Sequence, residues 1–165
     1  MSGRYKIAGM GASAALLVAL AVNEGYTPTA VIPVKGDVPT VGFGSTVKED
    51  GAPVRMGDTT TPVQALQRTL AHIQKDESGI KRCVTAPLTQ TEYDVMVDFT
   101  YQYGVPTLCS SSMVKLANRG DYAGSCQAYA EYRFVKKRDC SIRSNGCYGV
   151  WTRQQARIAK CMGAQ

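Results

Sequence analysis

The sequence predicts an α+β fold in which one β-hairpin near the N-terminus is followed by about five helices. Its 44% of hydrophobic and 19% of charged residues are typical of a globular protein rather than a disordered one. Short β-branched pieces with Gly and Pro around them occupy residues 30–46, and helix-start and helix-stop residues recur after residue 61. The 165 residues are enough for one domain with a proper hydrophobic core.

The first expected element is an apolar helix over residues 7–22, which carry no charged side chain and follow the cationic start MSGRYK. Such a helix spans about 24 Å at roughly 1.5 Å per residue, less than the ~30 Å of hydrocarbon in a bilayer. Gly9, Gly11 and Ser13 also dilute its apolar character. We predict a membrane-anchor helix that can leave the bilayer. The alternative is a cleaved signal peptide, because ALA at 19–21 resembles a cleavage site.

The β-hairpin follows a single carboxylate, Glu24, that ends the apolar run. Apolar neighbours are expected to shield Glu24 from water, and a shielded carboxylic acid keeps its proton more readily than an exposed one. Gly36 and Asp37 mark the expected turn, because both residue types favour tight turns.

The remaining elements are helices with recognisable start and stop residues. Thr61 and Pro62 open the first, in which Val63, Leu66, Leu70 and Ile73 share one face. A capping box, Thr89-x-x-Glu92, opens a second helix that stops at Gly104. Three more are expected over residues 110–118, over a segment that Asp121 caps and that contains Cys126, and over residues 153–162 with Thr152 as the cap.

Positive charge is concentrated at the C-terminal end of the chain. From Glu131 onward there are eight basic residues and two acidic ones, which accounts for the whole net charge of +6. A basic surface suits a polyanion such as nucleic acid, anionic lipid or an acidic cell-wall polymer. The alternative is a solvated face that aids solubility. The basic residues are Arg133, Lys136, Lys137, Arg138, Arg143, Arg153, Arg157 and Lys160.

The six cysteines indicate disulfides rather than a metal or redox site. There is no C-x-x-C pair and only one histidine, His72, so we expect neither a zinc site nor a cofactor. An even number of cysteines in a small chain is typical of an oxidising compartment, but six cysteines allow about fifteen pairings. Only Cys140 and Cys147 are paired by local sequence, since they bracket the polar segment SIRSNG.

Several stretches together resemble a known family. They are EGY at 24–26, DVPTVGFG at 37–44, YDVMVDFTYQYG at 93–104, CSSSMVKLANRGDYAGSC at 109–126 and TRQQARIAKC at 152–161. The chain resembles the phage-type lysozymes of glycoside hydrolase family 24, in particular endolysins with a signal-anchor-release segment. The resemblance implies a lysozyme-like fold with a small N-terminal β-hairpin lobe and a larger helical lobe. It also implies a release segment over residues 1–22 and a catalytic domain over residues 23–165.

The resemblance implies catalytic roles for three residues. Glu24 matches the general acid of the family, and Thr40 matches a hairpin threonine that helps to position the catalytic water. The family usually has Asp six positions before that threonine, where this chain has Val34. Asp37 is the nearest carboxylate on the hairpin. It either replaces the missing Asp or only shapes the turn, and an ordinary strand position is the alternative for Thr40.

Further residues are carried over from the family in the same way. Tyr101, Ser111 and Thr152 match positions that line the sugar-binding cleft, although core packing or helix capping is the alternative for each. Cysteines of related lysozymes imply the pairs Cys83–Cys161 and Cys109–Cys126 beside Cys140–Cys147.

The implied function is hydrolysis of the β-1,4 bond between N-acetylmuramic acid and N-acetylglucosamine in peptidoglycan, which causes host lysis. The enzyme is expected to be a monomer without cofactor, metal or nucleic-acid partner. Residues 7–22 are expected to hold it at the periplasmic face of the inner membrane of a Gram-negative host until a holin triggers release. The alternatives are a lytic transglycosylase and a non-catalytic module that binds the cell wall.

Overall fold

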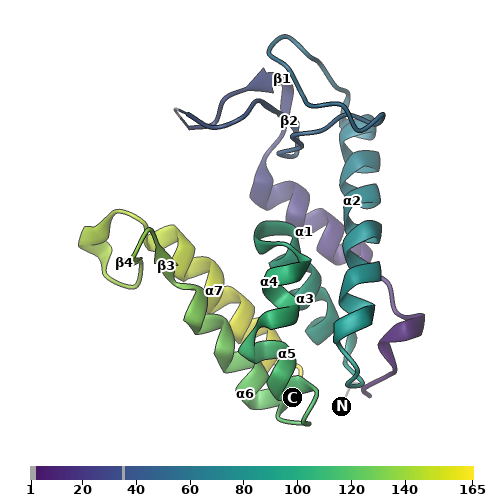
Figure 1. Ribbon diagram of the computed structural model, residues 1–165, viewed down its shortest axis with the longest axis vertical. Coiled ribbons are helices and arrows are strands. Elements are labelled where there is room, and N and C mark those ends of the chain that lie inside the picture. Colours follow the sequence, from purple (N-terminus) through teal and green to yellow (C-terminus); the bar gives the residue numbers. More distant parts are fainter. Residues whose placement is uncertain (1–2, 35) are drawn as a thin grey trace. The chain divides into compact units, whose positions relative to one another are not determined.

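The computed structural model describes residues 3–34 and 36–165, which form two compact units (Figure 1). The hairpin unit is Ala12–Glu77. The helical unit combines the described part of Met1–Gly11 with Ser78–Gln165. Each unit is described by itself.

The hairpin unit contains the predicted β-hairpin. Strand β1, Thr27–Val31, pairs antiparallel with strand β2, Thr40–Gly42, and the register shifts between the two bridged ends of β1. Gly36 lies in the connection with φ +89°, a backbone conformation that favours glycine, so the predicted turn is confirmed. The core beneath the hairpin is small and consists of Ala30, Val41 and Val54.

The apolar N-terminal run does not form one helix over residues 7–22. Residues Ile7–Gly9 make a short 3₁₀ turn, η1, in the helical unit, and helix α1, Ala14–Glu24, lies in the hairpin unit. The Ser13 hydroxyl caps α1 by accepting a hydrogen bond of 3.1 Å from the Leu16 N–H, which fixes the start of the helix there. Within residues 3–34 and 36–165, no helix combines the length and the apolar character needed to cross a bilayer. The membrane-anchor helix therefore stays a prediction.

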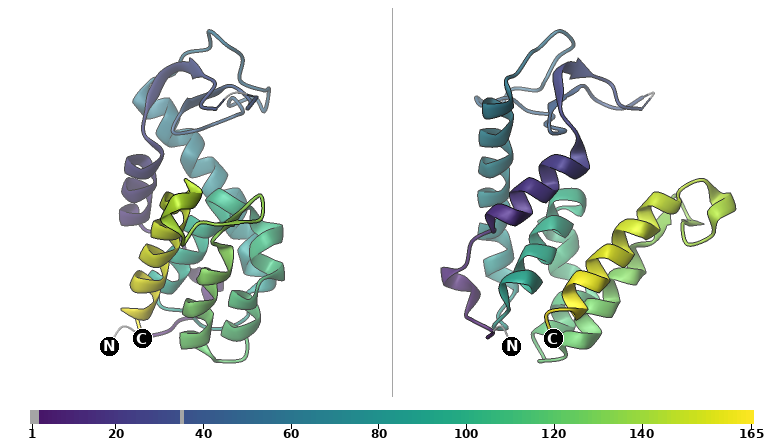
Figure 2. Two further views of the ribbon diagram at one scale, coloured as in Figure 1. Left: turned by 90° about the vertical axis from the view of Figure 1, so that its left-hand side faces the viewer. Right: turned by 180° about the vertical axis from the view of Figure 1, so that it is seen from behind.

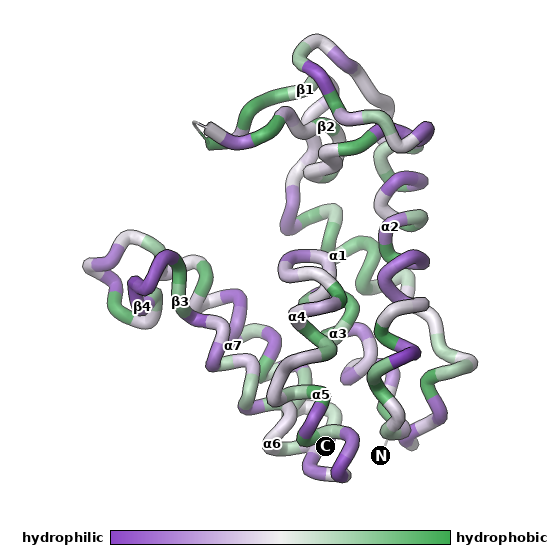
Figure 3. Tube along the Cα trace, in the orientation of Figure 1, coloured by the Kyte–Doolittle hydropathy of each residue, from purple (hydrophilic) through white to green (hydrophobic). Residues whose placement is uncertain are grey.

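Helix α2, Pro62–Cys83, begins where predicted and runs from the hairpin unit into the sequence of the helical unit. Polar and apolar residues alternate along it, as in an amphipathic helix (Figure 3). Of its predicted apolar face, Ile73 is fully buried, whereas Val63, Leu66 and Leu70 remain partly exposed. These three line an apolar groove of about 700 Å³ against Leu17 and other residues of α1.

The helical unit contains five helices, two further 3₁₀ turns and a second hairpin in the described residues (Figure 2). Several of these elements are absent from the sequence prediction, among them α4 and the second hairpin. Helix α4 has only six residues, and the strands β3 and β4 have two each, so none shows a readable periodicity. The elements are α3 Gln90–Tyr103, α4 Val105–Ser110, α5 Ser112–Ala117, α6 Tyr122–Gln127, η2 Ala128–Tyr132, β3 Phe134–Val135, β4 Arg138–Asp139, η3 Arg143–Asn145 and α7 Tyr148–Met162.

Most of the predicted helix caps are present. Thr89 and Glu92 form both hydrogen bonds of the capping box at the start of α3, and Asp121 caps α6 by accepting from the Gly124 N–H at 2.8 Å. Thr152 is not a cap, so that prediction is wrong. Helix α7 begins earlier, at Tyr148, and the Thr152 hydroxyl donates to the Tyr148 carbonyl oxygen within the helix at 3.2 Å.

The core of the helical unit is built around aromatic rings. Phe99 and Tyr129 are almost completely buried, and their ring centroids lie 5.7 Å apart in an edge-on arrangement. The Arg157 side chain is 3% exposed and donates to Asp98 at 2.6 Å and to the Gln102 side-chain oxygen at 3.0 Å. The buried guanidinium therefore has both an ionic and a neutral acceptor.

The disulfides correct two of the three expected pairs. Cys140–Cys147 is confirmed, but the others are Cys83–Cys109, with Cα atoms 5.5 Å apart, and Cys126–Cys161, at 5.4 Å. The expected pairs Cys83–Cys161 and Cys109–Cys126 are therefore wrong.

The observed pair Cys83–Cys109 is explained by the packing of the short helix α4 on the end of α2. An added Cβ on Gly79 would meet the Val105 side chain at 2.5 Å, so the two helices approach closely at this glycine. This contact brings Cys109 beside Cys83 at the end of α2. Helix α6 packs on α7, and this contact places Cys126 beside Cys161.

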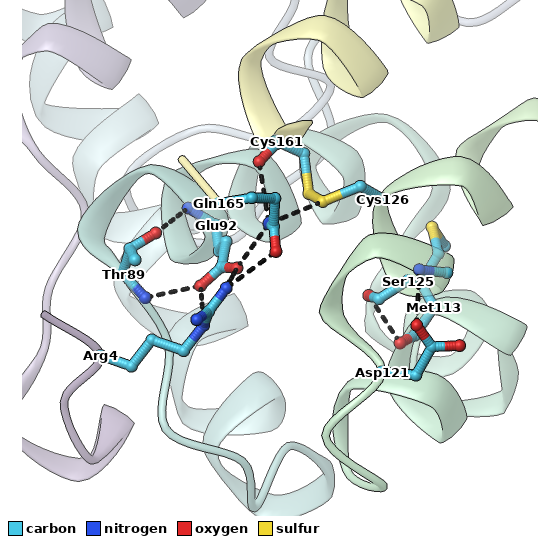
Figure 4. Close-up of a disulfide and its surroundings, with 10 residues drawn as sticks. Arg4, Thr89, Glu92, Met113, Asp121, Ser125, Cys126, Cys161 and Gln165 are labelled. Atoms are coloured by element: carbon cyan, nitrogen blue, oxygen red, sulfur yellow. Dashed lines mark hydrogen bonds and ion pairs between the residues drawn. A yellow bond between two sulfur atoms is a disulfide. The ribbon is translucent and has the colours of Figure 1, made fainter. Parts of the chain in front are cut away.

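The N-terminal segment is bound to the helical unit at α3 (Figure 4). Tyr5 and Leu88 exchange two backbone hydrogen bonds, of 2.8 and 2.9 Å. Arg4 donates to the Glu92 carboxylate at 2.8 Å and to the Gln165 side-chain oxygen at 2.9 Å. Burial alone would raise the pKa of Glu92, but the hydrogen bonds from Arg4, Thr89 and Gln165 outweigh it and hold that pKa below its usual value.

Candidate active site

Glu24 is the last residue of α1, and Gly25 ends the helix with φ +70°. The side chain is exposed, so the shielding by apolar neighbours that the sequence suggested is not present. A helix end followed directly by glycine places the carboxylate between α1 and the first strand of the hairpin. The Glu24 side chain, which belongs to the hairpin unit, is therefore accessible to a substrate.

The loop after β2 lies against the Glu24 carboxylate. A Cβ atom added to Gly44 would stand 3.6 Å from Glu24 Oε2, which is van der Waals distance, and Gly44 has φ +78°. Gly42, with φ +68°, leaves no room for a side chain, because its Cβ would lie 2.7 Å from the Cβ of Ala65 on α2. The two glycines thus fix the loop between α2 and the candidate acid.

Tyr26 holds the chain just after Glu24. Its hydroxyl donates a hydrogen bond of 2.7 Å to the Thr60 carbonyl oxygen, and its ring lies 5.5 Å from that of Phe43. Arg68 donates to the Thr60 hydroxyl at 2.6 Å and to Glu49 at 2.7 Å, and the hydrogen bond from Arg68 lowers the pKa of Glu49. A chain of polar contacts therefore braces the segment that carries Glu24.

Gly44 and Tyr26 lie in stretches that carry the family resemblance, but the sequence predicts a role for neither. The available signal was the pair of glycines spaced two residues apart directly after a β-like run, in TVGFG, together with the aromatic residue two positions after the carboxylate. What the sequence does not show is that these segments meet.

Thr40 is the first residue of β2 and lies opposite Val31 of β1. Its hydroxyl donates a weak hydrogen bond of 3.4 Å to the Val31 carbonyl oxygen. A hydroxyl that donates to the backbone keeps its oxygen lone pairs for a water molecule. Thr40 is in the same unit as Glu24, and its catalytic role stays a prediction.

Asp37 is exposed and takes part in the turn. Its N–H donates to the Val34 carbonyl oxygen at 2.9 Å, and its Oδ1 accepts from the Val38 N–H at 2.8 Å. These contacts are those of a turn-shaping aspartate. Asp37 Oδ1 carries this hydrogen bond, and the role of Asp37 as the replacement for the carboxylate missing at Val34 stays a prediction.

The three predicted substrate contacts, Tyr101, Ser111 and Thr152, all belong to the helical unit. Tyr101 lies in α3 and is half-buried. Ser111 is 4% exposed, and its hydroxyl caps α5 by accepting from the Val114 N–H at 3.3 Å. Thr152 is exposed on α7. Capping is thus observed for Ser111, while sugar contacts stay predictions for all three.

Side chains that commonly bind metal ions are not clustered in the described part of the chain. Over residues 3–34 and 36–165, no three side chains of His, Cys, Asp or Glu are grouped so as to hold a metal ion.

Comparison with known proteins identifies the family. The sequence matches the phage lysozyme family over residues 21–157. This protein belongs to the phage lysozyme family. It is similar to the SAR-endolysin of Pseudomonas phage phiKMV, at 32% identity over 151 residues that cover 92% of this chain and 88% of the relative.

Solved structures agree with this assignment. An endolysin from Escherichia coli O157:H7 phage FAHEc1 superposes with a TM-score of 0.80 at 27% identity, covering 98% of this chain and 96% of that one. A mutant of P22 lysozyme gives a TM-score of 0.77 at 24% identity over 93% of this chain and 99% of the other, and supports the fold alone. The helix-dominated lysozyme-like fold with small hairpins is therefore established, and membership of the family makes this protein a peptidoglycan hydrolase.

Proposed function

We propose that this member of the phage lysozyme family is a muramidase with Glu24 as its general acid. It cleaves the β-1,4 bond between N-acetylmuramic acid and N-acetylglucosamine and so lyses the host cell. The observation that carries the proposal is the approach of the Gly44 backbone to the Glu24 carboxylate at the end of α1. An accessible carboxyl group in the same unit as a hairpin hydroxyl whose oxygen can still accept a hydrogen bond suits glycoside hydrolysis.

In the proposed reaction, Glu24 gives its proton to the oxygen of the leaving sugar as the glycosidic C–O bond breaks. A water molecule, oriented by the Thr40 hydroxyl, attacks the anomeric carbon and loses a proton. Asp37 is the candidate base for that proton, provided that its carboxylate turns away from the Val38 N–H. Substrate contacts at Tyr101, Ser111 and Thr152 are part of the same proposal.

The test is a turbidity assay on Gram-negative cells with a permeabilised outer membrane. Glu24→Gln keeps the shape of the side chain but has no proton to donate, so the rate of lysis is expected to fall by at least ~10²–10⁴-fold. Glu131→Gln serves as the matched control, since it removes an exposed carboxylate from the helical unit. Full lysis by Glu24→Gln would overturn the role of the acid. Binding to cell walls without release of fragments by the wild type would favour a non-catalytic module.

Lytic transglycosylase activity is a second candidate, and a specific observation favours it. Val34 supplies no carboxylate, and Asp37 is engaged in the turn, so the acid Glu24 is the one carboxylate whose role has a clear counterpart in the family. A transglycosylase forms an anhydro sugar without water. Mass analysis of the released fragments separates the products, and Asp37→Asn retains activity under this mechanism but loses it if Asp37 is the base.

We also infer that residues 1–22 act as a signal-anchor-release segment ahead of a catalytic domain over residues 23–165. The support is the weakly apolar run 7–22 and the similarity to a SAR-endolysin. The protein would wait at the inner membrane of a Gram-negative host and enter the periplasm when a holin collapses the membrane potential. Fractionation is expected to find full-length protein first in the membrane and later in the soluble fraction. A soluble form shortened by the first twenty or so residues would show signal-peptide cleavage instead.

A further inference from the structure

The second hairpin of the helical unit gathers positive charge at one place. We call residues 133–143 the basic hairpin, because they contain five basic residues and a single acidic one, Asp139. Lys136, Lys137, Arg138 and Arg143 are exposed. The segment lies at the start of α7, at the opposite end of that helix from the C-terminus (Figure 1). The muramidase proposal gives this charge no role.

The turn of the basic hairpin is formed by two residues that do not favour its conformation. Lys136 and Lys137 have φ values of +46° and +68°, and they are the two non-glycine residues with positive φ in the described chain. Such two-residue turns are commonly Asn-Gly or Gly-Gly, because a side chain at positive φ costs free energy. The tip of the basic hairpin therefore has two lysines in a strained backbone conformation, which Asn or Gly would adopt at a lower cost in free energy.

The basic hairpin is held in shape without help from either lysine. The Asp139 carboxylate accepts from Arg133 Nε at 3.1 Å and from the Ser141 hydroxyl at 2.7 Å. The Asn145 side-chain amide donates to the Asp139 carbonyl oxygen at 2.8 Å, and the buried Cys140 is joined to Cys147. The two lysines are thus presented on a rigid frame that does not need them.

Apolar side chains are exposed beside the charges. Phe134 is 49% exposed and Ile142 is 52% exposed, although both lie within the disulfide-braced region of the unit. The Arg133 guanidinium stands 4.7 Å from the centroid of the Phe134 ring, so cation and ring form one surface. Charged and exposed apolar side chains therefore share one surface, a combination that suits an anionic surface with an apolar layer below it.

We propose that the basic hairpin docks the protein on the surface of a bilayer that contains anionic phospholipid. Phosphate groups at the bilayer surface attract lysine and arginine, and the layer below accepts apolar side chains at the level of the headgroups. The polar stem peptides of a cell wall offer carboxylates but no apolar layer for Phe134 and Ile142. The proposal is independent of the reaction assigned to Glu24.

The test uses full-length protein and vesicles of phosphatidylcholine with and without phosphatidylglycerol. Lys136→Asn combined with Lys137→Gly removes two charges and supplies the preferred turn. Because each basic residue near an anionic surface is worth about fivefold in affinity, this variant is expected to bind phosphatidylglycerol vesicles roughly 10- to 30-fold more weakly. Binding to pure phosphatidylcholine stays unchanged. The midpoint of thermal unfolding is expected to rise by about 2–4 °C, since strain is relieved.

The matched control is Lys115→Gln combined with Lys160→Gln, which removes the same charge from exposed positions on α5 and α7. It is expected to change vesicle binding less than threefold, because the effect depends on the hairpin rather than on net charge. Phe134→Ser is expected to weaken binding to phosphatidylglycerol vesicles without changing its salt dependence. Equal losses for the two lysine pairs overturn the proposal. Loss of binding to purified cell walls with unchanged vesicle binding overturns it as well and identifies the wall as the partner.

Discussion

The two units of this molecule are stabilised in different ways. The helical unit has three disulfides and a core of fully buried aromatic and aliphatic side chains, such as Phe99, Tyr129 and Met113. The hairpin unit has no cysteine in residues 12–77, and the buried cluster beneath its hairpin consists of three side chains, Ala30, Val41 and Val54. It also leaves Val22, at 76% exposure, and Val63, at 64%, open beside its apolar groove.

This difference indicates that the helical unit mainly provides stability, whereas the hairpin unit carries the candidate acid. The unit that carries the candidate acid depends on glycine conformations and single hydrogen bonds, such as the one from Tyr26 to the Thr60 carbonyl. Such contacts are lost at low free energy, whereas covalent links and dense packing persist. Variants of the helical unit should therefore change stability, and variants beside Glu24 should change activity.

The largest effect is expected from removing the disulfide between α6 and α7. Cys126→Ser combined with Cys161→Ser opens a loop of 35 residues and should lower the free energy of unfolding by about 4 kcal/mol. Urea denaturation followed by fluorescence of Trp151, the single tryptophan and a residue of α7, measures the loss. Cys140→Ser combined with Cys147→Ser opens a loop of only 7 residues and should cost about 2 kcal/mol. Equal losses would contradict the loop-length argument.

An intermediate effect is expected where the N-terminal segment meets α3. Arg4→Ala removes charge-assisted hydrogen bonds to Glu92 and should cost about 2 kcal/mol at neutral pH. Glu92 has its pKa held below the ordinary value of 4.5, so its contribution to stability is present above pH 4.5 and is lost as the pH falls below that value.

The measurement for this ion pair is the pH dependence of unfolding. Between pH 7 and pH 3, the wild type should lose more stability than Arg4→Ala, because the variant has less of this contribution to lose. Glu92→Gln should flatten the profile in the same way. A wild-type profile that parallels both variants would show that the pair makes no contribution.

The smallest effect on stability, but a clear effect on activity, is expected from Gly44→Ala. A side chain at φ +78° costs about 1–2 kcal/mol, and its methyl group would touch Glu24 Oε2. Lysis should fall by more than the loss of folded protein explains. Gly51→Ala is the control, since Gly51 has a similar φ of +81° and an added Cβ there meets nothing within 4 Å. Equal activities of the two variants, both folded, would remove Gly44 from the site.

Features fixed by neighbouring residues could be predicted from the sequence. The capping box at Thr89 and Glu92, the cap at Asp121 and the turn at Gly36 depend on contacts over a few positions, and all three are observed. The predicted helix cap at Thr152 is wrong, because α7 begins earlier, at Tyr148, and no side chain caps that start.

Features fixed by tertiary packing could not be predicted in the same way. The partner of Cys83 depends on α4, a six-residue helix that Gly79 allows to approach α2. The contact between Gly44 and Glu24 depends on how the loop folds back after β2. Family resemblance supplied the candidate acid, but the surroundings of that acid needed the structure.

The docking of the N-terminal segment has a consequence for the order of folding. Arg4 and Glu92 are 88 positions apart in the sequence, whereas Cys140 and Cys147 are separated by 7. Closing the longer loop costs about 2 kcal/mol more in chain entropy. Contacts of such long range form only after the local helices have assembled. The segment that contains Arg4 and Tyr5 therefore joins the helical unit last and detaches first, so its backbone amides should exchange with solvent well before the core opens.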